Sequence, residues 1–231
     1  MGKIFFISGK SSTGKDTIYN RLLEDAKLGL KKVTMYTTRP MRSGETDGVE
    51  YYFVSDAQSM LHEEDGSIVE MRVYNTVYGP WKYYTRIDGQ IDLSGQDNYL
   101  AVGTIEAYRK YCDYYGNEHV VPIYIEIDDG VRLQRALDRE RHEQEPHYRE
   151  MCRRYIADDD DFSEENIKLC GIQKRFVNDV LEECIEEIKN YIFNILALPK
   201  SVTFRTGCEK VTTEQRKSYI KPVFVEKHDK M

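Results

Sequence analysis

The stretch KIFFISGKSSTGKDT, residues 3–17, decides how this chain folds. Its first six residues form a short apolar run, which is typical of a buried strand. The pattern G-x-x-x-x-G-K follows at residues 9–15, and residues 15–26 carry apolar positions at helical spacing. A glycine loop between a strand and a helix points backbone N–H groups and the positive helix end at one anion. We therefore predict a phosphate-binding loop at residues 9–17.

Outside this stretch, strand-like runs alternate with helical patterns. We expect strands at 33–36, 98–104, 120–127 and 174–177, and helices at 105–115, 131–157 (interrupted at Pro146) and 180–197. Such alternation predicts right-handed βαβ units and a mostly parallel sheet flanked by helices. The fold class is thus α/β, with a P-loop NTPase-like core at residues 1–36 and 94–195. The four aspartates Asp158 to Asp161 are expected to end the helical stretch as a solvated loop.

A smaller unit is expected to interrupt the core at residues 37–93. This region is rich in glycine, tyrosine and charge, with strands expected at 68–74 and 82–93 and a helix at 56–64. The Asp88-Gly89 step is a hairpin signal. After residue 195 the pattern fades, so residues 196–231 are treated as a C-terminal extension.

Composition narrows the class of protein. The 231 residues carry a net charge of −7, from 33 basic and 40 acidic residues, which argues against a nucleic-acid coat or a polybasic membrane anchor. No apolar run reaches membrane-spanning length. The five cysteines are odd in number and form no C-x-x-C pair, so neither a disulfide framework nor a zinc site is indicated. We expect a cytoplasmic protein that binds neither nucleic acid nor membrane.

A second stretch, YTTRPMRSGETDGVEYYF at residues 36–53, has its own phosphate chemistry. Arg39 and Arg42 offer forked, permanently charged donors that suit a phosphate. Tyr51 and Tyr52 offer hydroxyl groups that can complete such a site. Two phosphate sites in one chain indicate a phosphoryl group moving between two phosphorylated ligands.

Together these two stretches resemble the guanylate kinase family of P-loop nucleoside monophosphate kinases, over roughly residues 3–195. The resemblance implies a transferase of purine nucleotide metabolism that moves the γ-phosphoryl group of ATP to a nucleoside monophosphate. GMP and dGMP are the acceptors expected first. It implies Mg²⁺ as cofactor, a monomer or homodimer, an acceptor-binding insert at 37–93 and a helical lid at about 135–160.

The resemblance also assigns residues to roles. It implies that ATP is bound by Gly9, Ser11, Ser12, Thr13, Gly14, Lys15, Asp16, Thr17, Arg135 and Asn178. It implies that the acceptor nucleotide is bound by Arg39, Arg42, Glu45, Tyr51, Glu70 and Tyr78. The residues that would stabilise the transferred group are Lys15, Arg42, Arg139, Arg153 and Arg154. Asp16 stands where the loop motif ordinarily has Ser or Thr, so magnesium falls to Asp16 and Thr17.

The chain departs from the family at positions that touch the base. Met35 aligns with a serine that contacts guanine, and Pro80 stands where Ser or Thr follows the Tyr-Gly pair. Ala101 and Gly103 occupy the place of an Asp-x-Asp strand end. Two alternatives therefore stay open: a kinase for a different phosphorylated acceptor, and a catalytically inactive protein-binding module. The retained Gly9, Gly14 and Lys15 argue against the inactive module.

Overall fold

The computed structural model of the chain describes residues 1–76 and 79–198. Tyr78, which was expected to bind the acceptor phosphate, lies outside the described residues. Residues 199–231, nearly all of the expected C-terminal extension, lie outside them as well.

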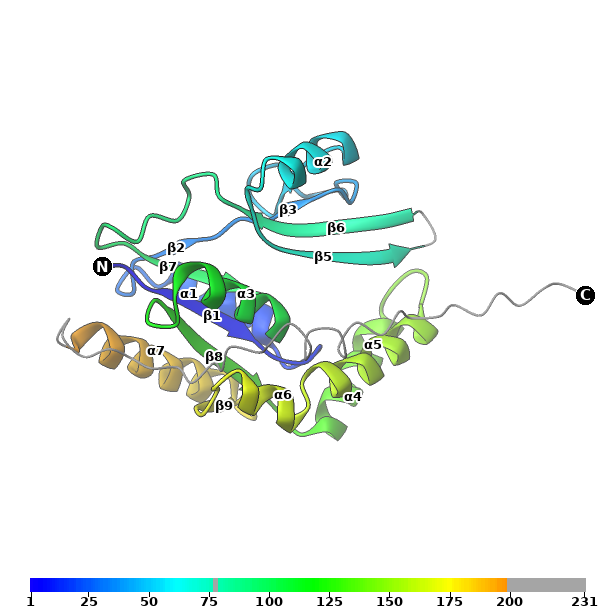
Figure 1. Cartoon of the computed structure of the whole chain (residues 1–231). Coiled ribbons are helices and arrows are strands. Elements are labelled where there is room, and N and C mark those ends of the chain that lie inside the picture. Colours follow the sequence, from blue (N-terminus) through cyan, green and yellow to red (C-terminus); the bar gives the residue numbers. More distant parts are fainter. Residues whose placement is uncertain (77–78, 199–231) are drawn as a thin grey trace, which may run out of the picture.

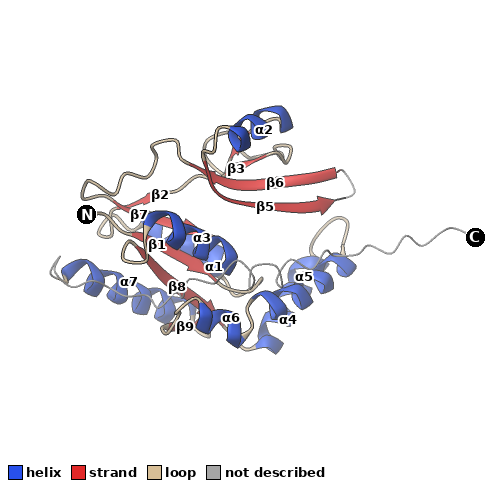
Figure 2. Ribbon diagram, in the orientation of Figure 1, coloured by secondary structure: helices blue, strands red, loops and turns tan. Residues whose placement is uncertain are grey.

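The core is a five-stranded parallel sheet with strand order β2-β7-β1-β8-β9. Its strands are β1 (Ile4–Ser8), β2 (Leu30–Lys32), β7 (Asn98–Val102), β8 (Val120–Glu126) and β9 (Arg175–Val177). In Figure 2 these strands run through the centre of the molecule with helices around them. The predicted α/β class with a mainly parallel sheet is confirmed.

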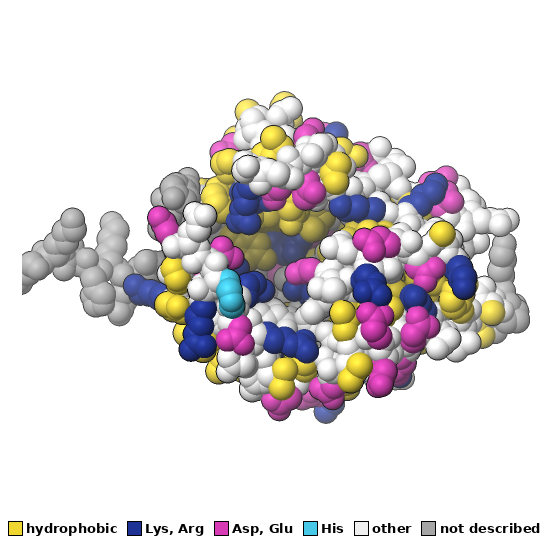
Figure 3. All heavy atoms as spheres, turned by 180° about the vertical axis from the view of Figure 1, so that it is seen from behind, with side chains coloured by type: hydrophobic (Ala, Val, Ile, Leu, Met, Phe, Trp, Pro, Cys, Tyr) yellow, Lys and Arg dark blue, Asp and Glu magenta, His cyan; other side chains and the backbone are white. Residues whose placement is uncertain are grey.

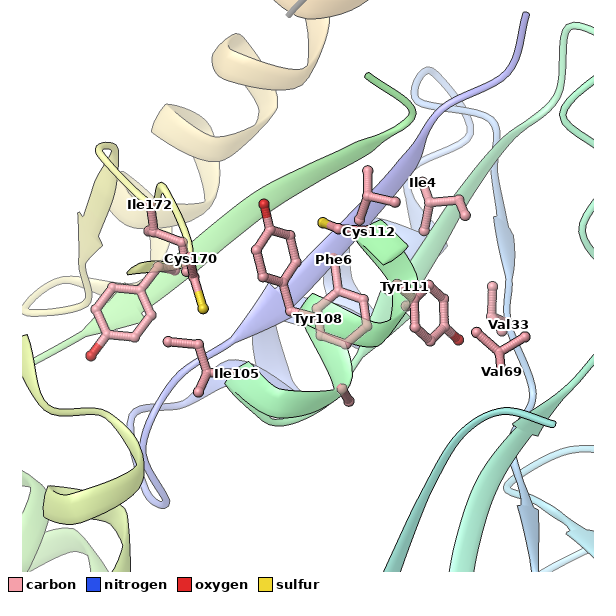
Figure 4. Packing of buried hydrophobic residues seen from close by; sticks show 14 of the residues in the cluster. Ile4, Phe6, Val33, Val69, Ile105, Tyr108, Tyr111, Cys112, Cys170 and Ile172 are labelled. Carbon is pink, nitrogen blue, oxygen red and sulfur yellow. The ribbon is translucent and has the colours of Figure 1, made fainter. Parts of the chain in front are cut away.

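Alternation along β1 divides the core into two clusters. Phe5 and Ile7 pack on the face covered by α1 (Lys15–Glu24) and α7 (Leu181–Ala197). Ile4 and Phe6 pack on the opposite face, against α3 (Ile105–Tyr115) and the residues around α6 (Glu164–Leu169). Figure 4 shows Phe6 beside Tyr108 and Tyr111 on that face. Since successive side chains of a strand point to opposite faces, a strand buried on both sides requires helices on both sides.

A second, four-stranded mixed sheet lies above the core in Figure 1. Its order is β4-β3-β6-β5, formed by β3 (Tyr36–Thr37), β4 (Tyr52–Phe53), β5 (Ile68–Thr76) and β6 (Gly79–Arg86). The helix α2 (Asp56–Glu64) covers its outer face, where the Tyr84 hydroxyl lies 2.8 Å from His62 Nδ1. The opposite face of the four-stranded sheet therefore faces the core.

A helix pair extends from the core beyond β8. It consists of α4 (Asp129–Arg141) and α5 (Tyr148–Asp161), which are in contact with each other. The Glu150 carboxylate raises the pKa of Arg153 on α5, and Tyr74 on β5 adds to that rise. The helix pair and the second sheet thus approach each other across an opening.

Several local expectations were wrong. Asp158 to Asp161 do not form a loop but complete the last turns of α5. The strand expected at 33–36 is replaced by β2 and β3, and α6 was not expected. The Asp88-Gly89 step lies in the irregular connection that follows β6, because β5 and β6 join before Gly79. The acidic residues at the end of α5 are tolerated because Arg132 pairs with Asp158 and Asp159. Without such a partner, acidic residues are disfavoured at a helix C-terminus.

Candidate active site

The loop between β1 and α1 has a conformation that only glycine supports at two positions. Gly14 has a φ of 88°, and a Cβ there would collide with the Asn178 side-chain nitrogen. A Cβ on Gly9 would collide with the backbone carbonyl oxygen of Ile125. The glycines therefore let the loop pack tightly against β8 and the residue that follows β9.

Asn178 holds this loop from the end of β9. Its Nδ2 donates a 2.7 Å hydrogen bond to the carbonyl of Thr13, and its backbone N–H donates to Glu126 over 2.9 Å. Its Oδ1 is buried and accepts no hydrogen bond from the described residues. A buried acceptor of this kind ordinarily has a partner, so a ligand donor is a natural complement.

A pocket of about 320 Å³ lies beside the loop. Its lining comprises Ser12, Gly14, Lys15, Asp16, Thr17, Arg135, Arg139, Asn178 and Leu181. The sequence had singled out all of these except Leu181, which carries no chemical signal. Arg135 reaches the loop by donating to the carbonyl of Asn178 over 3.4 Å. Three cations at a helix N-terminus make this pocket suited to a chain of phosphates.

The other side of the loop is held by α5. The backbone N–H of Ser11 donates to Asp158 over 2.7 Å, and Lys10 pairs with Asp159 over 2.7 Å. Behind them Arg132 is fully buried and pairs with Asp129, Asp158 and Asp159 at 2.9–3.3 Å. Arg132 was not predicted from the sequence, where its one local signal is the acidic Asp129 three positions earlier on the helix.

Asp16 and Thr17 are two of the oxygen-bearing residues that line the pocket. Both lie exposed in the first turn of α1, and the Asp16 carboxylate is 3.8 Å from Lys15 Nζ. Within residues 1–76 and 79–198, no group of three or more His, Cys, Asp or Glu could hold a metal. Oxygen donors in this small number fit Mg²⁺, which keeps waters and phosphate oxygens as its other ligands.

Several residues expected to bind the acceptor phosphate contact one another in this conformation. Arg39 is almost completely buried and makes a forked pair with Glu45 at 2.7 and 3.0 Å. Its guanidinium also lies over the Tyr51 ring, 5.6 Å from the centroid. Glu45 accepts from the backbone N–H of Arg42 over 2.7 Å, and its hydrogen bond with Arg39 lowers the pKa of the Glu45 carboxyl. Among the described residues, no carboxylate pairs with the exposed Arg42 guanidinium.

Glu70 is buried at the start of β5, where a one-residue bulge turns it toward Thr85. It accepts a 3.1 Å hydrogen bond from Thr85, whose hydroxyl lies 2.9 Å from that of Tyr111 on α3. Figure 4 shows the Tyr111 ring directed from α3 toward Val33 and Val69. Burial raises the pKa of the Glu70 carboxyl, and the neighbouring Arg72 opposes this rise. Arg72 pairs with Glu70 at 3.2 Å and was not predicted.

A larger cleft of about 820 Å³ separates β5 from α3 and includes Arg72, Tyr74 and Thr104 in its lining. Figure 3 shows one face of the molecule hollowed, with Lys and Arg side chains around and inside the hollow. On α5, Arg153 and Arg154 both pair with Glu150, at 2.7 and 2.9 Å. Their hydrogen bonds lower the pKa of Glu150 to about 2, the Arg153 bond most strongly. Neither arginine lines the pocket beside the phosphate loop in this conformation.

Comparisons with known proteins agree with this geometry. The sequence model described as guanylate kinase matches residues 1–195. A guanylate kinase of Porphyromonas gingivalis is 29% identical over 200 residues, which are 85% of this chain and 100% of that protein. A guanylate kinase of Anaplasma phagocytophilum is 30% identical over 211 residues, 89% of this chain and 90% of that protein.

The solved structures include a similar fold. The crystal structure of guanylate kinase from Anaplasma phagocytophilum matches with a TM-score of 0.56 and 24% identity, over 85% of this chain and 87% of that one. At this identity the match establishes the fold.

None of the helices in the described part of the chain is both long and apolar enough to cross a membrane.

Proposed function

The chain belongs to the guanylate kinase family, and we propose that it transfers the γ-phosphoryl group of ATP to GMP or dGMP, yielding ADP and the nucleoside diphosphate. One observation carries the proposal. A cationic pocket beside a glycine loop lies in the same chain as a second arginine and tyrosine cluster on a separate sheet. A donor and an acceptor phosphate can thus be bound by two units that approach each other.

ATP is proposed to bind along the loop at residues 9–17. Backbone N–H groups and Lys15 would hold its phosphates, while Arg135 and Arg139 line the same pocket. Asn178 lines the same pocket, where its side chain would lie near the adenine. Asp16 and Thr17 would hold Mg²⁺, which when bound neutralises phosphate charge.

The acceptor nucleotide is proposed to bind on the inner face of the second sheet. Arg42 would hold the phosphate with its free guanidinium, and Arg39 would use donors that Glu45 has already oriented. Tyr51 lies against Arg39, and Tyr78 is assigned by the family pattern alone. Glu70 would accept hydrogen bonds from the guanine base.

Transfer needs positioning and charge stabilisation more than acid–base chemistry. The attacking phosphate oxygen is already ionised at neutral pH, so no protein base is required. Lys15 and Arg139 would stabilise charge on the transferred group, joined by Arg153 and Arg154 when α5 moves toward the loop. Closure of the helix pair over the second sheet would exclude water and so prevent hydrolysis of ATP.

Each chain carries the full set of candidate residues, so we propose that a single subunit suffices, alone or within a homodimer. A reducing cytoplasm is the proposed setting, since Cys112, Cys152, Cys170 and Cys184 form no disulfide within the described part of the chain.

ADP formation over a panel of nucleoside monophosphates tests this proposal. We expect turnover with GMP and dGMP, and loss of turnover in Lys15→Met, with the far-UV circular dichroism unchanged. Lys32→Met is the matched control, because Lys32 is exposed on β2 and, among the described residues, donates only to the backbone carbonyl of Val49. Turnover with AMP or UMP in place of GMP would favour the kinase for another acceptor. No turnover with any acceptor would favour the inactive binding module.

A further inference from the structure

Arg72 lies where a base would meet Glu70. The two residues are two positions apart on β5 and pair across to Tyr83 and Thr85 of β6, so their side chains share one face of the sheet. Arg72 Nε lies 3.2 Å from Glu70 Oε2, and Arg72 Nη2 lies 3.4 Å from Oε1. Arg72 Nη2 also lies 3.1 Å from the Met35 sulfur. Glu70, Arg72 and Met35 therefore meet at one point.

The pair is rigid on one side and open on the other. Glu70 is anchored by the hydrogen bond from Thr85, which continues to Tyr111. The Arg72 side chain is 14% exposed and lines the 820 Å³ cleft. A guanidinium has five N–H donors in a fixed fork, and among the described residues Arg72 Nη1 donates to no acceptor. The N–H groups of Nη1 are thus left over in a residue that lines the cleft.

Four positions at which the family contacts the base supply no such donors here. Met35 has a thioether, which only accepts, and Pro80 has neither a hydroxyl nor a backbone N–H. Ala101 and Gly103 have no polar side-chain group. Guanine presents two donors, N1–H and the 2-amino group, next to two acceptors, O6 and N7. A carboxylate complements the first pair, and a guanidinium beside it complements the second.

We propose that Arg72 is a base-contact residue of the acceptor site, donating hydrogen bonds to O6 and N7 of guanine while Glu70 accepts from N1–H and the 2-amino group. The inference rests on the proposed function and assigns to this chain a guanine contact from its own β5. It explains how a base pocket can select guanine although Met35 and Pro80 carry no donor. Arg72 then contacts the base directly, in addition to balancing the charge of Glu70.

The test compares three substrates with three proteins. GMP is set against 7-deaza-GMP, which lacks the N7 acceptor, and against IMP, which lacks the 2-amino group. Wild type is set against Arg72→Met and against Arg86→Met, a control on the same sheet whose arginine pairs with Asp65 and Ser67. For each combination kcat/KM is measured, together with the thermal melt of each protein.

In wild type and Arg86→Met we expect 7-deaza-GMP to be several-fold poorer than GMP. Arg72→Met should lower kcat/KM for GMP by about 5- to 150-fold, the range of a bidentate guanine contact. In Arg72→Met the further loss with 7-deaza-GMP should disappear, whereas discrimination against IMP should persist because Glu70 supplies it.

Two results would overturn the inference. If wild type uses 7-deaza-GMP as well as GMP, Arg72 does not contact N7, and this comparison holds even if Arg72→Met fails to fold. If Arg72→Met keeps the full 7-deaza penalty, Arg72 only balances the charge of Glu70. Failure of the proposed function looks different: wild type would then phosphorylate no guanine nucleotide, and the Arg72 assignment would fall with it.

Discussion

The Asn178 carboxamide lies against Gly14, with its nitrogen hydrogen-bonded to the Thr13 carbonyl over 2.7 Å. This hydrogen bond connects the phosphate loop to the end of β9. Asn178 and Thr13 are 165 positions apart in the sequence. It leaves no room for any side chain at residue 14. The loop shape is thus determined as much by a distant amide as by its own glycines.

Gly14→Ala should abolish most activity, because the added methyl group would displace the Asn178 amide and φ of 88° disfavours alanine. Gly89→Ala is the matched control. Gly89 has a φ of 85°, but a Cβ there meets no atom within 4 Å. We expect the control to cost only about 1 kcal/mol of unfolding free energy from backbone strain. Equal losses of kcat/KM for ATP in both variants would contradict the packing argument.

Arg132→Met should destabilise the protein. The substitution leaves the largely buried Asp158 without its cation, whereas Asp129 and Asp159 are half exposed and keep Lys10, so we expect a loss of about 1.5–3 kcal/mol. Because Asp158 also accepts from the loop N–H of Ser11, the KM for ATP should change as well. Arg141→Met on the same helix removes an exposed pair with Asp138 and should cost at most about 1 kcal/mol. Denaturant unfolding of both variants measures the difference, and similar values would refute the role given to Arg132.

The Glu70–Arg72 pair predicts a non-additive double mutant. Glu70→Leu alone leaves a largely buried guanidinium without its carboxylate, and Arg72→Met alone leaves a buried carboxylate without its cation. Each single change should cost about 3–5 kcal/mol, whereas replacing both members of a buried pair can be nearly neutral. We therefore expect the double variant to melt close to wild type and above both single variants. A double variant whose loss equals the sum of the single losses would show that the two residues are not coupled.

Glu150 should make the stability of α5 depend on acid. Its pKa is lowered from 4.5 to about 2, first by the Arg153 hydrogen bond, so the ionised form is favoured in the folded state. The pair therefore stabilises the protein fully above pH 4.5, and this contribution is lost as the pH falls toward 2. Because Glu150 is 41% exposed, its contribution should stay below about 1 kcal/mol. The Tm difference between wild type and Glu150→Gln should shrink over this interval; a constant difference would argue against the assignment.

Local sequence patterns were enough to predict the parts of the fold that rest on nearby residues. Residues 3–17 predicted strand, loop and helix together, and the helix at 105–115 was predicted with the bounds of α3. In both cases the apolar periodicity is strong and a turn or cap lies at the end. The bulge in β5 and the helical state of Asp158 to Asp161 depend instead on partners elsewhere in the chain.

The candidate site divides in the same way. Lys15, Asp16 and Thr17 lie at the pocket as expected, because they belong to one continuous motif. Arg72 and Arg132 escaped notice because charged residues on strands and helices are common, and only the folded chain brings their carboxylate partners to them. The roles of Arg39, Arg42, Tyr51 and the arginines of α5 stay predictions.

The most direct test of the central claim follows the phosphoryl group itself. ATP carrying ¹⁸O on its γ-phosphate is incubated with Mg²⁺, GMP and the protein, and the products are analysed by mass spectrometry. We expect the label to appear in the β-phosphate of GDP in step with ADP formation, and Lys15→Met to prevent its appearance. Label that appears only in inorganic phosphate, or that never leaves ATP, would contradict it.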